Sequence, residues 1–166
     1  MSEMKNKLRW CLKKAEKELK EGKKHRGLVV SEEDIERARE HIKKAEHYLE
    51  ATLFLKEGFS DIGASTAFYA IYHSFLAILA KYGYESRNQE CTFVTVYSLI
   101  EDKKIDLGRD LVDKISLMKS SDESSIVEIR ESYQYGTELS MQEKLYDETI
   151  EIAKKILGKA KTIIEI

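Results

Sequence analysis

The segment Ile62–Ala80 contains no charged residue, and this feature restricts the fold more than any other part of the sequence. A helix that is uncharged on every side must be covered on every side. The segment is long enough to cross a bilayer, but its hydroxyl groups and the His73 imidazole would then be desolvated in hydrocarbon at a high cost. We therefore expect no membrane insertion. We expect a central helix, covered by its own bundle on one side and by a second copy of the chain on the other.

The remaining sequence predicts further helices around this central segment. Apolar residues recur at three- and four-residue spacing, and proline, which interrupts helices, is absent. The 166 residues and their 42% hydrophobic content suit one compact, ordered domain. Helices of such length favour a bundle. Besides the central helix, we expect helices at about residues 2–21, 31–58, 88–101, 107–118, 126–133 and 140–166.

Local signals mark the start of two of these helices. Ser140 and Glu143 match a capping box, in which each side chain binds the backbone amide of the other residue. Ser31 and Asp34 match a variant with aspartate in place of glutamate. Residues 88–101 are rich in β-branched side chains and could form a strand. Because no second such run is present to pair with it, we interpret this segment as a short helix.

The net charge of −2 is unevenly distributed along the chain. Residues 1–26 contain ten Lys and Arg against four Asp and Glu, whereas the rest contains 18 basic and 26 acidic residues. This distribution excludes a uniform basic footprint for duplex DNA but leaves a basic N-terminal arm on an acidic body. We divide the chain into an amphipathic helix with a basic loop, residues 1–30, and a bundle, residues 31–166. The apolar stripe of the first helix favours docking on protein over contact with nucleic acid.

Cysteine and histidine usage excludes several kinds of site. Cys11 and Cys91 are too few for a disulfide scaffold and form no zinc-binding pair. The N-terminus also lacks the apolar core of a signal peptide, so we predict a reducing, cytoplasmic location. His25, His41 and His47 have no second ligand at metal-binding spacing, and we expect them on the solvated surface. We expect neither a metal nor a cofactor.

Two groups of residues could form a functional site. Tyr69 and His73, four residues apart, lie on one face of the central helix. They are either core residues with locally satisfied polar groups or part of a polar pocket or subunit interface in which His73 exchanges protons. Arg130 lies in an apolar-periodic stretch, so its guanidinium should be drawn partly inward. It requires either a carboxylate of a neighbouring helix or a phosphate flanked by Tyr133 and Tyr135 as stacking platforms.

Three motifs, in order along the chain, resemble the HEPN (higher eukaryotes and prokaryotes nucleotide-binding) family. The segment Ala45–Ala51, followed by the turn Lys56–Phe59, is similar to the helix that precedes the family's central helix. The run A-F-Y-A-I-Y-H at Ala67–His73 resembles the central-helix motif A-Y-Y-A-x-F-H, and Ile129–Tyr135 resembles the segment L-R-x-x-A-D-Y. The similarity covers about residues 35–160 and leaves the N-terminal helix outside.

The resemblance implies an all-α fold, an up-and-down bundle of four to five long antiparallel helices. The helical patterns of this sequence add an N-terminal helix and short connecting helices to that bundle. It also implies a homodimer, which we place at the helix 62–80. Many members are RNases or toxins that pair with a minimal nucleotidyltransferase antitoxin. Catalytic members have an arginine followed, after four to six residues, by a histidine. Here Tyr135 stands where the histidine would be, and Gln134 replaces the motif's aspartate.

These features favour a non-catalytic or weakly active HEPN-like protein that binds a nucleotide or RNA phosphate, or a nucleotidyltransferase partner. The ligand site would consist of Arg130, Tyr135, Tyr69 and His73. The enzymatic alternative is a metal-independent RNase, in which Arg130 stabilises the pentacoordinate phosphate and His73 moves the proton. The third alternative is a purely structural dimer that recruits another protein.

Overall fold

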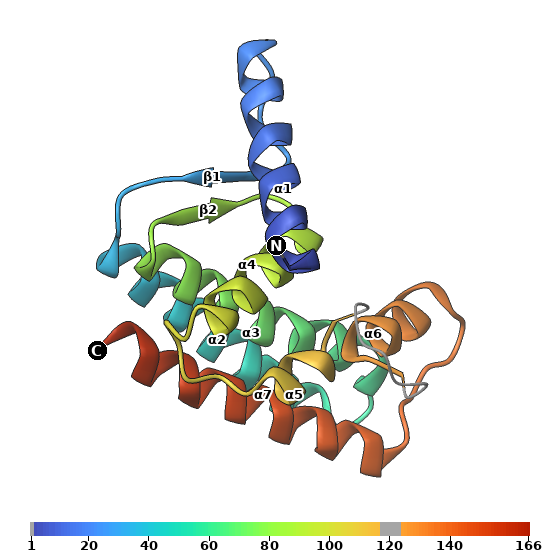
Figure 1. Ribbon diagram of the computed structural model, residues 1–166. Helices are drawn as coiled ribbons and strands as arrows, with labels where there is room; N and C mark the ends of the chain where they lie inside the picture. The colour runs from blue at the N-terminus through green and yellow to red at the C-terminus, as the bar shows by residue number, and fades with distance from the viewer. Residues whose placement is uncertain (1, 117–123) are drawn as a thin grey trace.

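The computed structural model describes residues 2–116 and 124–166, which form seven α-helices and one two-stranded ribbon (Figure 1). The predicted all-α helical bundle is confirmed. In chain order the elements are α1 (Glu3–Lys20), β1 (Leu28–Val30), α2 (Ile35–Leu55), α3 (Ser60–Lys81), β2 (Tyr84–Ser86), α4 (Gln89–Glu101), α5 (Arg109–Asp113), α6 (Ile126–Tyr135) and α7 (Glu143–Ile164).

The helix α3 is the central element, because α2, α4, α6 and α7 all pack against it. Its Phe68, Ile71 and Phe75 are buried in the main hydrophobic core. Within the described residues, α3 is the one helix whose length and composition would allow it to cross a membrane. However, 61% of its most apolar window is buried inside the protein, as in the core helix of a soluble protein.

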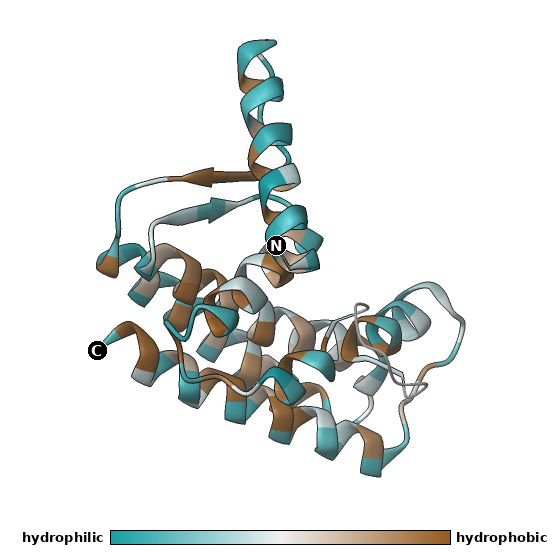
Figure 2. Cartoon of the chain, in the orientation of Figure 1, coloured by the Kyte–Doolittle hydropathy of each residue, from teal (hydrophilic) through white to brown (hydrophobic). Residues whose placement is uncertain are grey.

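The long helices α2, α3 and α7 form the body of the bundle, and α7 packs against both of the others. Figure 2 shows apolar residues alternating with hydrophilic ones along α7, as expected for a helix with one buried face. A close approach joins α3 to α7 at Gly63, where an added Cβ would overlap the buried ring of Tyr146. The Tyr146 hydroxyl reaches further and donates to the Thr52 carbonyl of α2.

Both predicted capping boxes are wrong in detail. Asp34, and not Ser31, caps α2, and its side chain accepts from the Arg37 amide at 2.9 Å. The Ser31 amide instead donates to the Gly83 carbonyl at 2.8 Å, because Ser31 still belongs to the connection that leaves β1.

At the start of α7, Gln142 is the capping residue, and no side chain caps the helix. Ser140 therefore does not cap it as predicted. The Met141 amide donates to the Ser60 hydroxyl of α3 at 2.7 Å, so a tertiary contact holds this segment. The structure places a capping box at α6, between Ser125 and Glu128.

The predicted helix at 107–118 is much shorter in the structure, where α5 covers only Arg109–Asp113. The carbonyl groups of Lys114 and Ile115 accept from the amides of Ile126 and Val127 at 3.0 and 3.2 Å, so they anchor the first turn of α6 instead of continuing α5. Met118, which was expected on this helix, lies outside the described residues.

The ribbon of β1 and β2 was not predicted. Its antiparallel strands pair Leu28 with Ser86 and Val30 with Tyr84. The helix α1 packs on β1 and on α4, and Figure 1 shows it standing out from the bundle. A disulfide joins Cys11 of α1 to Cys91 of α4, across 80 residues of sequence, although two cysteines alone had not predicted one. Because disulfides persist mainly in oxidising surroundings, this bond does not fit the reducing environment expected from the sequence, and the cytoplasmic location stays a prediction.

Candidate functional site

The guanidinium of Arg130 is drawn inward, as predicted. Arg130 is only 8% exposed and lies on the face of α6 that packs on α3. Its guanidinium carbon is 4.6 Å from the ring centroid of Phe68 on α3, a cation–π geometry. The guanidinium therefore rests against an aromatic ring of the central helix.

The polar partners of Arg130 lie on its own helix. Nη1 donates to the Gln134 Oε1 at 2.6 Å, and Nη2 is 3.8 Å from the Glu131 Oε1, beyond hydrogen-bonding distance. Nε is buried and makes no hydrogen bond. The expected salt bridge to a neighbouring helix is not formed among the described residues. The Arg130 guanidinium is therefore held by Phe68 and Gln134, and its charge is only partly neutralised by Glu131.

The two predicted tyrosines of α6 lie in different surroundings. Tyr133 packs against a small second core formed by residues of α3, α7 and the connection before α7. Tyr135, the last residue of α6, is 76% exposed. Of these two tyrosines, Tyr135 therefore has the more exposed ring.

The predicted pair of Tyr69 and His73 belongs to an aromatic cluster between α2 and α3. The Tyr69 ring lies 5.4 Å from Tyr48 of α2, and the His73 ring stacks on Tyr48 at 5.6 Å, measured between centroids. The Nδ1 atoms of His73 and His41 are 3.0 Å apart, so one of them donates and the other accepts. His41 was expected on the solvated surface, which is wrong: it is partly buried in this contact, whereas His47 is exposed as predicted.

Burial suppresses protonation of both imidazoles in this contact. Desolvation, the charge of His41 and the charge of Lys44 lower the pKa of His73 to about 4. Desolvation and the charge of Arg37 also lower the pKa of His41. At neutral pH both rings are therefore uncharged, and neither is a ready proton donor.

Arg130 and His73 are connected only indirectly. The Phe68 ring contacts the Arg130 guanidinium. It also contacts the rings of Tyr69 and Tyr72, at centroid distances of 5.3 and 5.7 Å. Tyr72 in turn meets His73 edge-on at 6.5 Å. Within the described residues, no direct contact joins Arg130 to His73.

Sequence reasoning missed Phe68, His41 and Tyr48. Phe68 had been placed in a motif without a role, and its contact with Arg130 joins segments far apart in the sequence. His41 and Tyr48 are seven residues apart, a spacing that puts both on one face of α2. This spacing was the sequence signal that could have indicated that the two side chains face the same neighbouring helix.

A groove with a volume of about 1000 Å³ lies elsewhere, between α5, α6 and α7. None of the four predicted site residues lines it. Ile129, Leu145 and Ile152 form an apolar part of its wall. The described lining includes two lysines and several carboxylates, so its charge disfavours phosphate: Asp110, Asp113, Glu143, Asp147, Glu148 and Glu151.

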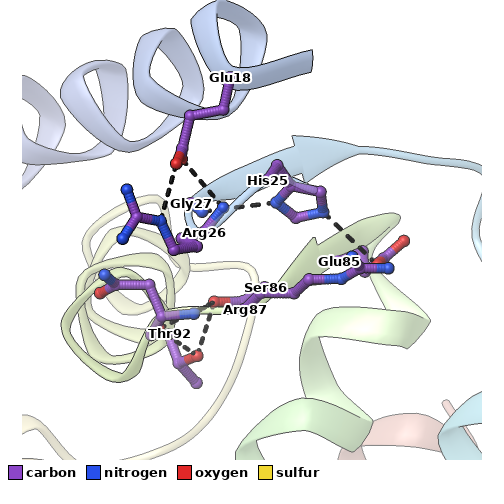
Figure 3. A network of polar contacts seen from close by, with 9 residues as sticks. Glu18, His25, Arg26, Gly27, Glu85, Ser86, Arg87 and Thr92 are labelled. Atoms are coloured by element: carbon purple, nitrogen blue, oxygen red, sulfur yellow. Dashed lines mark hydrogen bonds and ion pairs between the residues drawn. The ribbon is translucent and has the colours of Figure 1, made fainter. Parts of the chain in front are cut away.

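A second polar network lies at the base of the N-terminal arm (Figure 3). His25 is 5% exposed, so the expectation of a solvated His25 is wrong. Its Nδ1 accepts from the Gly27 amide at 3.4 Å, and its Nε2 lies 3.5 Å from the Glu85 carboxylate of β2. Glu18 of α1 binds the backbone amide and the side chain of Arg26 at 3.0 and 2.8 Å. These contacts fasten the loop after α1 to the ribbon.

Among the described residues, no group of three or more His, Cys, Asp or Glu side chains is placed to hold a metal ion. Comparison with protein-family models finds no matching family, and comparison with curated proteins finds no match.

Proposed function

We propose that the chain is a HEPN-like helical-bundle protein, non-catalytic or weakly active, that binds a phosphate of RNA or of a nucleotide at Arg130. The observation that carries the proposal is the state of the guanidinium: it is held in place on Phe68, with an unpartnered Nε and no carboxylate within hydrogen-bonding distance. A buried cation in this state gains from an anionic ligand. Gln134 and Glu131, both exposed, are the side chains that a phosphate would displace.

The surroundings of Arg130 support a nucleotide or RNA over a free phosphate. Tyr135 ends the same helix with its ring largely in solvent, where it can stack on a base. Tyr69 lies beside Phe68 and is partly exposed. A minimal nucleotidyltransferase, the partner that the resemblance suggests, would be recruited through the same exposed end of α6.

The properties of His73 support the non-catalytic form of the proposal. A general acid at neutral pH needs a proton to give, and the pKa of His73 is lowered to about 4. Its Nδ1 is also engaged by His41. The RNase alternative requires Arg130 and His73 at one phosphate, and the contacts between them pass through Phe68 and Tyr72.

A homodimer is part of the proposal. Between Ile62 and Ala80, the incompletely buried positions of α3 are uncharged and recur every three or four residues along one stripe of the helix. A second copy of the chain would cover this stripe. The positions are Ile62, Ser65, Thr66, Tyr69, Tyr72, His73 and Leu76.

The test is a binding titration with Arg130→Met. Methionine keeps an unbranched apolar stem against Phe68 while removing the charge and the hydrogen-bond donors. Because a hydrogen bond to a charged group contributes about 1.5–3 kcal/mol, we expect the affinity for a labelled single-stranded RNA or for ATP to fall at least about tenfold. Fluorescence anisotropy measures the RNA, and calorimetry measures the nucleotide.

The matched control is Lys154→Met, which removes one exposed positive charge of α7. Circular dichroism must show equal helicity for both variants and the parent. Equal affinity of Arg130→Met and the parent would refute the phosphate site. RNA cleavage by the parent that both Arg130→Met and His73→Phe abolish would establish the RNase alternative instead.

A further inference from the structure

One face of the helix α1 packs against other elements of the same chain. Met4, Cys11 and Ala15 are buried, and the helix packs on α4 and on β1. The disulfide from Cys11 to Cys91 ties this face to α4. The predicted docking of the apolar stripe on protein is therefore met within the chain for most of its length, although Leu19 at its end is 51% exposed.

The opposite face is basic. Arg9, Lys13 and Lys17 are all exposed and follow one another at four-residue spacing, so they form a line along the helix with about 6 Å between successive residues. Lys14 flanks this line. Figure 2 shows that most of the α1 ribbon has the colour of hydrophilic residues. We call Arg9, Trp10, Lys13, Lys14 and Lys17 the basic face.

The cations of the basic face have carboxylates in their vicinity but no close partner among the described residues: Lys13 acts on Glu16 and Lys17 on Glu21 only through their charge. Other cations of the arm have partners: Lys5 pairs with Asp102 at 2.5 Å, Lys20 with Glu16 at 2.9 Å and Arg26 with Glu18 at 2.8 Å. Arg9, Lys13 and Lys17 make no ion pair with any described carboxylate. A line of cations without close ion-pair partners attracts a linear polyanion.

The exposed Trp10 indicates which kind of polyanion would bind to the basic face. It lies off the apolar stripe, is 55% exposed, and has the Lys14 ammonium 5.3 Å from its ring centroid. An exposed aromatic ring among cations that track a backbone is the arrangement that binds single-stranded nucleic acid, in which the bases are free to stack. A duplex offers no such base.

From this arrangement we infer that the basic face of α1 binds the phosphate backbone of single-stranded nucleic acid, with Trp10 stacking on a base. An anionic membrane fits less well, because an interfacial helix inserts its apolar face and that face of α1 is covered by α4 and β1. The inference does not depend on the phosphate site at Arg130, which lies on a different helix.

Trp10 is the only tryptophan of the chain, so its fluorescence reports on the basic face directly. We expect a short uridine oligonucleotide to quench this emission, and an oligothymidine of equal length to do the same because the phosphates are shared. Arg130→Met must leave the quenching in place, which separates this inference from the proposed function. Quenching that disappears with Arg130→Met would place the RNA elsewhere and overturn the inference.

The decisive variant is Lys13→Gln with Lys17→Gln, measured by anisotropy at several salt concentrations. Each phosphate contact to a single strand contributes about 0.7 to the slope of log affinity against log salt. Loss of two contacts should therefore reduce the slope by about 1.4 and lower the affinity roughly tenfold at low salt. Lys154→Gln with Lys155→Gln, on α7, changes the net charge equally and should leave both quantities unchanged.

Three results would overturn the inference. The first is an unchanged affinity of Lys13→Gln/Lys17→Gln, and the second is an equal loss in the α7 control, which would indicate an effect of net charge alone. The third is a blue shift of the Trp10 emission with vesicles of anionic phospholipid but no response to either oligonucleotide. That outcome would indicate that the basic face binds anionic membranes.

Discussion

At the scale of single residues, the contact between His41 and His73 shows how burial can remove a histidine from proton chemistry. The two Nδ1 atoms share one hydrogen bond at 3.0 Å, and a proton added to the accepting Nδ1 would break this bond and place a cation in the contact. Lys44 and Arg37 add positive charge from α2. The imidazoles therefore serve packing between α2 and α3 at neutral pH.

The pair should make the stability of the protein depend on pH. In the unfolded chain His73 binds a proton near pH 6.5, whereas in the fold its pKa is lowered to about 4. Between these values the unfolded chain binds more protons, so stability is full above about pH 6.5 and is lost as the pH falls toward 4. Allowing for solvent screening of a partly exposed group, we expect a loss of about 1–2 kcal/mol.

The measurement is urea unfolding, followed by circular dichroism, between neutral and mildly acidic pH. His73→Gln should flatten the pH dependence in this window. His47→Gln, which changes an exposed histidine of α2, should leave it as in the parent. A parent whose unfolding free energy is constant across the window would contradict the buried, neutral pair.

Part of the candidate site could be predicted from the sequence, residue by residue. The apolar periodicity around Arg130 was sufficient to predict that its guanidinium turns inward. The periodicity could not indicate that Phe68 would receive it, because that contact depends on the packing of α6 on α3. His41 was misplaced for a related reason: its charged neighbours on α2 suggested solvent, but α3 covers that edge of the helix.

At the scale of elements, helices were predictable and the ribbon was not. Helical periodicity accumulates over many residues, and α2 and α7 each present it over more than five turns, whereas α3 was recognised by its long uncharged run. The strands β1 and β2 have three residues each, too few to show alternation, and each exists only because the other pairs with it. The failed Ser140 cap has a similar origin, since Ser60 satisfies the backbone there.

The contact between α3 and α7 yields a prediction at this scale. Gly63→Ala introduces a methyl group into the ring of Tyr146, which is buried and held by its bond to Thr52, so the ring cannot simply turn away. We expect the free energy of unfolding to fall by about 1–3 kcal/mol, as in other overpacked cores.

Gly158→Ala is the matched control, because it lies on α7 with open space around its Cβ position. Alanine there should stabilise the helix by up to about 1 kcal/mol. Thermal or urea unfolding of both variants gives the comparison. If the two substitutions had the same effect, the tight approach of α3 to α7 at Gly63 would be wrong.

At the scale of the whole molecule, the charge-free central helix sets both the fold and the expected assembly. Ala70 and Ala77 are completely buried within a single chain, so they belong to the internal core and not to a subunit interface. The uncharged stripe that is left partly exposed runs through Ile62, Tyr69 and Leu76 instead. An exposed stripe of this composition on the most central helix is a surface that a second copy would cover.

Charge placed on that stripe should dissociate the homodimer. Ile62→Glu with Leu76→Glu would bury two unpaired carboxylates at the interface, whereas in a monomer both would remain in contact with water. We expect the parent to have the mass of a dimer in light scattering and the double variant that of a monomer with unchanged helicity. Val30→Glu, on the exposed edge of the ribbon, should leave the mass of the dimer unchanged.

A monomeric parent would mean that the stripe is not covered by a second copy, and a dimer that survives both glutamates would place the interface on another face. Either result would remove the dimer from the proposed function while leaving the Arg130 site open to its own test.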